Sequence, residues 1–305
     1  MKRTLAILVA ALACLPAMAE EAKPPRNTAE LLELTTPEDW RTPDPANLLY
    51  LELPKGRVII ELAPEFAPLH AANIRKLVDG RFFDGLAVVR VQDNFVAQWG
   101  DPQAGEDNAR SYGDAATSLP PEYFRAMIAG EPFTPMPGPD GWAPEGGFVQ
   151  GFHAARDPAT GQIWLPHCYG AVGVGRDLAD DSGSGGELYA IIGHAPRTLD
   201  RNITVVGRIL DGIEHLSALP RGTGPLGFYE TPEERTLISS VRFAADLPED
   251  ERTNIEVLRT DSDRFRQLID IRRNRQDDFY HTPAGYLDLC AMNIPVRKPD
   301  EEKAP

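Results

Sequence analysis

The sequence predicts a mainly β protein, built as a closed antiparallel β-barrel with flanking helices, a long insertion and a helical C-terminal extension. Two observations lead to this prediction. Short runs of β-branched, aromatic and aliphatic residues recur between turn residues, and helical periodicity is confined to a few short segments. Many short strands with few helices are typical of an antiparallel barrel. With 305 residues, 42% of them hydrophobic, the chain is long enough for one large or two modest domains.

The strand-like runs begin with a hairpin. Residues 48–53 and 57–62 are rich in Leu, Ile and Val, and the Pro54-Lys55-Gly56 tripeptide between them is a turn signal. A second tight turn is expected at residues 92–94, between two later strands. The other expected strands are residues 86–91, 95–98, 169–174, 188–192, 203–209 and 237–243.

Two segments have the spacing of an amphipathic helix. In residues 70–78 the apolar side chains stand three or four positions apart, and the pattern ends at Gly80. In residues 262–274 apolar positions recur among Arg and Asp, and Ser262 is suited to cap the N-terminus. We expect the first helix to bury one face and the second to pack onto the barrel. One further helical turn is expected at 29–34.

The barrel domain is expected to span residues 48–245, after a leader at 20–47 and before a C-terminal extension at 246–305. Within it, residues 102–166 are rich in Gly, Pro and Asp and form an enlarged insertion, with one short helix expected at 122–129. A loop of this length inside a domain is uncommon. Two interpretations stay open: the insertion decorates the domain, or it is a lid that binds a partner.

The N-terminus has the pattern of a signal peptide, residues 1–19. Lys2 and Arg3 precede an apolar run, which ends in Ala17-Met18-Ala19. The run is shorter than the roughly 20 residues that span a bilayer, so we expect cleavage near Ala19 and a periplasmic or secreted protein. The alternatives are a membrane anchor and, because Ala11-Leu12-Ala13-Cys14 loosely resembles a lipoprotein box, a lipid attached to Cys14.

The charge of the chain excludes some partners. The formal net charge is −15 and becomes −17 once Lys2 and Arg3 are removed. Nucleic acids and anionic membranes bind clustered Lys and Arg, so neither is an expected partner. Nothing in the sequence indicates an oligomeric state. After cleavage Cys168 and Cys290 remain, and they form either a disulfide or two free thiols.

Other catalytic patterns are missing from the sequence. The six histidines have no paired spacing of the kind that a zinc helix uses, and there is no P-loop and no Gly-x-Ser-x-Gly motif. Asp177, Asp180 and Asp181 fit a solvated loop better than a cation site. We therefore expect no metal and no cofactor.

Several landmarks appear together in a fixed order. They are GRVIIEL at 56–62, Pro68 with AAN at 71–73 and Leu77, FFDG at 82–85, RVQDNFVAQWGD at 90–101, and LDRNITVVGRI at 199–209. On these motifs, residues 48–243 resemble the cyclophilin family of peptidyl-prolyl cis/trans isomerases. The resemblance implies rotation about X-Pro bonds in proline-containing polypeptides, with no metal or covalent intermediate.

The resemblance also assigns site residues. Arg90 matches the donor that stabilises the twisted amide, Phe95 the aromatic residue of the proline pocket, and Gln98 the residue that binds the substrate carbonyl. A guanidinium is always charged and presents several N–H groups in a rigid fork, which suits the first role. Without the resemblance, Arg90 would be interpreted as a member of a surface ion pair and Phe95 as an ordinary core residue. Val96 is placed at the same pocket.

The opposite wall departs from the family. The alignment places Ala190 where a pocket phenylalanine is usual, Thr198 on a tryptophan and Ile203 on a histidine, while Leu199 keeps a pocket leucine and Gly175 lies in the segment that pairs with the substrate backbone. Val89 replaces a histidine, and Trp99 stands where a small residue is usual. Refilling of this wider wall by Trp99 or Tyr189 stays open.

This altered wall motivates a second functional hypothesis. A cyclophilin-like module of weak or absent activity could bind extended segments of exported proteins as a chaperone or assembly scaffold. The insertion and the C-terminal extension would supply additional binding surface. The sequence therefore predicts an isomerase, of full or reduced activity, with a chaperone or scaffold as the alternative.

Overall fold

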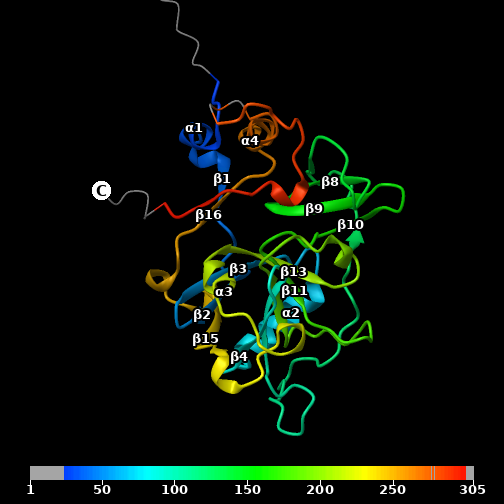
Figure 1. The fold of residues 1–305 in the computed structure, drawn as a ribbon, viewed down its shortest axis with the longest axis vertical. Helices are drawn as coiled ribbons and strands as arrows, with labels where there is room; N and C mark the ends of the chain where they lie inside the picture. The colour runs from blue at the N-terminus through cyan, green and yellow to red at the C-terminus, as the bar shows by residue number, and fades with distance from the viewer. Residues whose placement is uncertain (1–23, 276, 278, 300–305) are drawn as a thin grey trace, which may run out of the picture.

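The computed structural model describes residues 24–275, 277 and 279–299, so the signal peptide and Cys14 lie outside the described residues. Figure 1 shows two layers: a curled sheet with its helices in the lower half, and a smaller layer of helices and strands above it. The upper layer takes its segments from both ends of the chain and from the middle. No helix in the described part is long and apolar enough to cross a membrane.

The main sheet of the described residues has nine strands, and neighbouring strands in it are antiparallel. The hairpin predicted at 48–62 is confirmed, with Leu53 paired to Gly56 across its turn. In sheet order the strands are β14 (Thr236–Leu237), β4 (Ala87–Val91), β5 (Val96–Gly100), β12 (Leu188–Ile191), β11 (Ala171–Val174), β13 (Val205–Asp211), β3 (Gly56–Leu62), β2 (Leu48–Leu53) and β15 (Ser240–Phe243).

The predicted barrel is present, but it is not fully closed. The edge strands β14 and β15 follow each other along the chain, and no ladder pairs them within the described part. Thr236 pairs with β4, whereas the N–H of Ser239 already donates to Glu52 of β2 (2.9 Å). The segment therefore pairs first with β4 and then with β2. Because a backbone group that is hydrogen-bonded to one of these strands is not available to the other, the segment cannot form a continuous ladder that closes the barrel.

Two helices cover the barrel and complete its interior. Helix α2 (Pro68–Asp79) is the flanking helix predicted at 70–78; it buries Ile74, Leu77 and Val78 in the main core. Helix α3 (Glu214–Ser217) adds Leu216 to that core. The barrel interior is thus a continuous apolar core, which holds the strands in place for the site on the outer face.

The insertion is a folded sheet. The helix predicted at 122–129 is wrong: residues 125–126 form a strand that pairs with β10, so cross-strand bonds replace helical ones. The five strands are, in order, β6 (Arg125–Ala126), β10 (Gln162–Trp164), β9 (Phe152–Asp157), β8 (Glu145–Val149) and β7 (Thr134–Pro135). The insertion thus has regular structure of its own.

The segments at 24–47 and 246–299 pair with each other. Strand β1 (Trp40–Arg41) pairs with β16 (Glu256–Leu258), which pairs with β17 (Val296–Arg297). Helix α1 (Thr28–Glu33) contacts α4 (Asp263–Arg273), and Figure 1 shows both at the top of the upper layer. The helix predicted at 262–274 is confirmed as α4. Its predicted cap is also confirmed, because the Ser262 side chain accepts a hydrogen bond from the Phe265 N–H.

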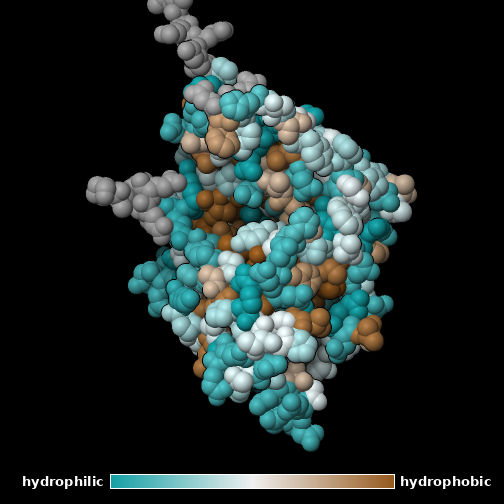
Figure 2. Space-filling model, viewed as in Figure 1, coloured by the Kyte–Doolittle hydropathy of each residue, from teal (hydrophilic) through white to brown (hydrophobic). Residues whose placement is uncertain are grey.

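A second apolar core joins the three segments. Phe148 of the insertion packs edge-on against Phe265 of α4 at a centroid distance of 4.8 Å, and Leu31 of α1 is buried in the same cluster. Tyr50 and Ile59 extend this cluster from the outer face of the barrel. Figure 2 shows a largely hydrophilic face, with hydrophobic residues gathered where the two layers meet. Burial of apolar surface therefore holds the upper layer on the barrel.

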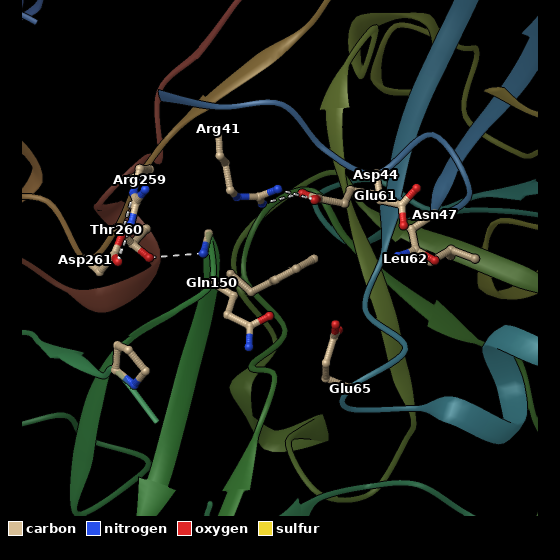
Figure 3. Close-up of a pocket in the computed structure, with 13 residues that line it drawn as sticks. Arg41, Asp44, Asn47, Glu61, Leu62, Glu65, Gln150, Arg259, Thr260 and Asp261 are labelled. Carbon is tan, nitrogen blue, oxygen red and sulfur yellow. Dashed lines mark hydrogen bonds and ion pairs between the residues drawn. The ribbon is translucent and has the colours of Figure 1, made fainter. Parts of the chain in front are cut away.

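One covalent link and one ion pair support this contact. Cys168 and Cys290 form a disulfide, which ties the C-terminal extension to the chain just after the insertion. Arg41 donates from both terminal nitrogens to Glu61 of β3, at 2.6 and 2.9 Å, as Figure 3 shows. Bidentate pairs of this kind fix geometry as well as charge.

Removal of the disulfide should destabilise the protein. The double variant Cys168→Ser, Cys290→Ser loses a crosslink across 122 positions of sequence, and we expect the free energy of unfolding to fall by about 2–4 kcal/mol. Urea unfolding followed by fluorescence measures this. Wild-type protein in dithiothreitol is the control and should behave like the variant; an unchanged midpoint in both would contradict the prediction.

Candidate active site

The site is built on two adjacent strands, and a β-bulge sets their register. Val88 of β4 pairs with Trp99 of β5, but the next pair is Arg90 with Gln98. Val89 is therefore the extra residue of the bulge. A bulge places two consecutive side chains on one side of a strand, and without it Val89 instead of Arg90 would face Gln98. The local irregularity thus brings the two predicted polar residues together.

Arg90 is held from three directions. Its Nε donates to the carbonyl of Leu226 (2.7 Å), its Nη1 donates to Gln98 Oε1 (3.0 Å), and its Nη2 donates to Gln92 Oε1. Leu226 has φ +58°, a conformation rarely adopted by leucine. A guanidinium has five N–H groups, so two remain for a ligand after these three bonds.

Aromatic rings flank the half-buried guanidinium. Its central carbon lies 5.5 Å from the ring centroid of Phe95 and 5.2 Å from that of Phe228. Burial lowers the pKa of Arg90, and the charge of Glu187 opposes this shift. The cation therefore sits in an environment drier than bulk water, where its field is less screened.

Gln98 joins Arg90 to a residue that the sequence did not predict. The Gln98 side chain is 8% exposed; its Oε1 accepts from Arg90 and its Nε2 donates to Glu187 Oε1. The opposite amide orientation would set N–H groups against Arg90 and an oxygen against a carboxylate. The charges on both sides thus define the orientation of the amide, and one N–H is left to bind a carbonyl.

Glu187 lies directly before β12, opposite the site-bearing strands. Burial raises the pKa of its carboxyl, the hydrogen bond from Gln98 lowers it, and the charges of Asp177 and Arg90 act in opposite directions. No motif marks this residue. Its position after the Gly185-Gly186 pair, at the start of an expected strand, was the one signal in the sequence.

The proline pocket predicted by the sequence is partly rearranged. Val96, 2% exposed, belongs to an apolar cluster on the outer face of the sheet, against which Phe95 packs. Tyr189 and Ile191 of β12 lie in the same cluster, and Ile203 also packs against it. The insertion contributes Val149, Phe152, Ala154, Ile163 and Leu165, so it packs beside the pocket.

Ala190 is not brought to this pocket. It is fully buried in the barrel interior and pairs with Ala97, another interior residue. Successive side chains of a strand point to opposite faces, so its neighbour Tyr189 lies on the outer face, in the cluster against which Phe95 packs. The assignment of Ala190 to the pocket is therefore corrected by one residue. Trp99 is also interior, so it does not refill the wall, whereas Tyr189 lies on the outer face beside Phe95.

The remaining predicted residues lie at the edges of the site. Leu199, half-buried, ends the short helix η2 (Arg197–Leu199), next to the exposed Thr198. Gly175 follows β11, and its N–H donates to the Glu187 carbonyl (2.8 Å). A Cβ on Gly175 would come within 3.1 Å of the Glu187 side chain, so the small residue leaves room for that carboxylate.

Tyr189 is anchored from behind by a buried hydrogen-bonded network. Its hydroxyl lies 2.8 Å from His167 Nε2, and His167 Nδ1 lies 3.1 Å from Asp200 Oδ1. Arg197 pairs with the same aspartate at 2.5 Å. Burial of the Tyr189 hydroxyl raises its pKa. The network thus keeps the ring in one position.

Two of the cavities in the described part of the chain bear on the location of the site. One, of about 450 Å³, is lined by Arg90, Gln98, Gly175 and Glu187. The other, of about 350 Å³, lies between the upper layer and the barrel, and Figure 3 shows Arg41, Glu61, Gln150 and Thr260 around it. Only the first contains predicted site residues. No group of three or more His, Cys, Asp or Glu in the described ranges is suited to hold a metal ion.

Comparison with known proteins identifies the family of this chain. The family model described as "Cyclophilin type peptidyl-prolyl cis-trans isomerase/CLD" matches residues 48–242. The chain belongs to the cyclophilin family. It is thereby assigned to the peptidyl-prolyl cis-trans isomerases, and the matched range contains Arg90, Phe95 and Gln98.

Individual relatives support the assignment. The "Probable peptidyl-prolyl cis-trans isomerase" of Brucella suis is 28% identical over 180 residues, which cover 59% of this chain and 74% of the relative. The "Putative thylakoid lumen peptidyl-prolyl cis-trans isomerase" of Synechocystis is 27% identical over 55% of this chain and 42% of its own length. The crystal structure of cyclophilin AquaCyp293 from Hirschia baltica covers 86% of this chain and 94% of its own, with a TM-score of 0.68 and 29% identity. That overlap extends beyond the cyclophilin domain.

A test of the Ala190 correction is the variant Ala190→Phe. Because Ala190 lies in the packed interior, the larger side chain should lower the free energy of unfolding by about 1–3 kcal/mol. Thermal unfolding measures this loss of stability, and a prolyl-peptide binding assay shows whether the variant binds prolyl peptides more tightly. Unchanged stability with tighter prolyl binding would instead place the residue in the pocket.

The variant Tyr189→Phe tests the network behind the pocket. It keeps the ring but leaves His167 Nε2 without its partner, and we expect unfolding to become easier by about 1–3 kcal/mol. The Michaelis constant for a prolyl peptide should rise more than the turnover number falls. Phe95→Tyr, which adds a hydroxyl to the same cluster, is the comparison; identical stability of wild type and Tyr189→Phe would refute the role.

Proposed function

We propose that this protein catalyses cis/trans isomerisation of X-Pro bonds in exported polypeptides, and that Arg90 does so by stabilising the twisted amide. One observation carries the mechanism: the Arg90 guanidinium is held on three sides, across from Gln98 and over Phe95, with two N–H groups left for a ligand. Family membership supports the reaction class.

The chemistry needs little more than this arrangement. Rotation about a peptide bond has a barrier of about 20 kcal/mol, because the nitrogen lone pair is delocalised. In the twisted state that lone pair returns to the proline nitrogen, where an N–H of Arg90 donates to it. A fixed donor of this kind stabilises the transition state more than the planar ground state. No proton has to leave either partner.

The other predicted residues position the substrate in this proposal. Phe95, Val96 and Leu199, together with Tyr189, hold the pyrrolidine ring by apolar contact. Gln98 donates its remaining N–H to the peptide carbonyl, so that one side of the bond stays fixed while the other rotates. The backbone beside Gly175 pairs with the extended peptide.

Export is supported by two features. The disulfide between Cys168 and Cys290 is typical of proteins in oxidising compartments, and the N-terminal residues have the pattern of a cleaved signal peptide. A relative carries a thylakoid lumen location in its name. We therefore propose a periplasmic or secreted protein whose mature chain begins near Glu20, with the cyclophilin-like domain at 48–245 between the leader and the extension.

The test is a protease-coupled isomerisation assay of residues 20–305. Arg90→Ala should lower kcat/KM by about 10²- to 10³-fold, because the donor is lost while the pocket remains. Arg266→Ala, which removes an exposed arginine of α4, is the matched control and should keep wild-type activity.

The same assay decides between enzyme and chaperone. Equal, background-level rates for wild type and Arg90→Ala would exclude the enzyme. Suppression of aggregation that survives in both would then support a peptide-binding chaperone. Exposed apolar side chains in the insertion, Phe124, Ile128 and Trp142, are available for such binding.

A further inference from the structure

The cavity beside Arg90 extends beyond the groups that the proposed reaction uses. It holds about 450 Å³ and continues from Gln98 toward a wall of small and acidic residues. The proposed reaction binds a pyrrolidine ring and one peptide unit, and neither group needs this wall as a binding surface. The residues that form it include Asp101, Gly175, Asp177, Ser182, Ser184 and Glu187.

Glu187 occupies a slot built by two glycines. A Cβ on Gly175 would lie 3.1 Å from Glu187 Cγ, and a Cβ on Gly100 would lie 3.2 Å from the same atom. Any larger residue at either position would press on the glutamate side chain. The stem of Glu187 is therefore packed in place, and the carboxylate is presented at the cavity wall.

The hydrogen bonding of this carboxylate is incomplete. Oε1 accepts from Gln98, but no donor to Oε2 is found among the described residues. A carboxylate accepts several hydrogen bonds, so it has capacity for a ligand. The Asp177 carboxylate lines the same cavity, and within the described part of the chain no hydrogen bond to it is found either.

Glu187 shares this cavity with a second carboxylate, that of Asp177. Its pKa is raised first by burial; the repulsion from Asp177 contributes more than the attraction of Arg90. Arg176, which lines the same cavity, donates to the Asn202 carbonyl at 2.9 and 3.1 Å and so points two of its nitrogens away from Glu187. The titratable and charged groups facing this cavity are Arg90, Asp101, Tyr112, Arg176, Asp177, Tyr229 and Arg235.

We propose that Glu187 is a specificity-determining residue, and that its carboxylate, together with that of Asp177, binds a lysine or arginine side chain of the polypeptide substrate. This inference rests on the proposed function, because the cavity opens beside Arg90 and Gln98. A basic side chain places its N–H groups between two carboxylates that otherwise repel each other. An acidic side chain at the same place would add a third negative charge.

The experiment uses alanine-based peptides with one central proline. A single Lys, Gln or Glu is placed at each of the three positions before and after the proline, and kcat/KM is measured together with binding by fluorescence anisotropy. At one position we expect Lys to exceed Glu by about tenfold, equivalent to about 1.4 kcal/mol. Gln should be intermediate, and added salt should reduce the difference.

The variant Glu187→Gln should remove most of this preference while retaining a hydrogen-bonding partner for Gln98. Glu33→Gln, which removes the same charge from an exposed residue of α1, is the matched control and should leave the preference unchanged. Because the Glu187 pKa is raised, its carboxylate is neutralised as pH falls through that raised value. The preference should therefore decline at a higher pH than an ordinary glutamate would give.

Two results would overturn the inference. One is equal binding of Lys and Glu peptides at all six positions, and the other is a Lys preference that Glu187→Gln leaves intact. If no peptide is turned over, that result would contradict the proposed isomerase activity but not the proposed charge preference. The anisotropy measurements still report the charge preference in that case, so the two failures are distinguishable.

Discussion

The antiparallel ladder of β4, β5 and β12 determines where the functional groups of this protein lie. Its bulge at Val89 turns Arg90 toward Gln98, and the pairing of β5 with β12 sets Tyr189 opposite Gln98. Side chains from three chain segments thereby meet on one face of the sheet. The position of each side chain depends on the backbone hydrogen bonds more than on its own contacts, because a shift of the strand register by one residue would move every side chain to the other face.

The barrel interior and the upper layer both support this ladder. The interior core fills the inner face of the strands with Val88, Ala97 and Trp99. On the outer face, the insertion packs against the cluster that contains Val96 and Tyr189. The upper layer thus packs against the cluster beside Phe95, and the disulfide at Cys168 ties it to the strand that follows.

The electrostatics of the site follow from partial burial. Arg90, Gln98 and Glu187 form a hydrogen-bonded row in which the amide is oriented by opposite charges at its two ends. Such a row preserves the direction of each donor without any proton transfer, which matches a reaction that changes only geometry. The same row leaves Glu187 with a negative charge at the cavity wall. Catalysis and substrate selection would therefore share one set of interactions.

The sequence by itself determined the family, the hairpin at 48–62, both amphipathic helices, and the positions of Arg90, Phe95 and Gln98. These features depend on local spacing, which a single strand or helix expresses without help from distant residues. Only the tertiary structure decided that Tyr189 and not Ala190 lies on the outer face beside Phe95, that Glu187 meets Gln98, and that Cys168 pairs with Cys290. It also decided that residues 122–129 contain a strand, and that the terminal segments and the insertion share one core. Those outcomes depend on register and on contacts between segments that are distant in the sequence, and no local pattern encodes them.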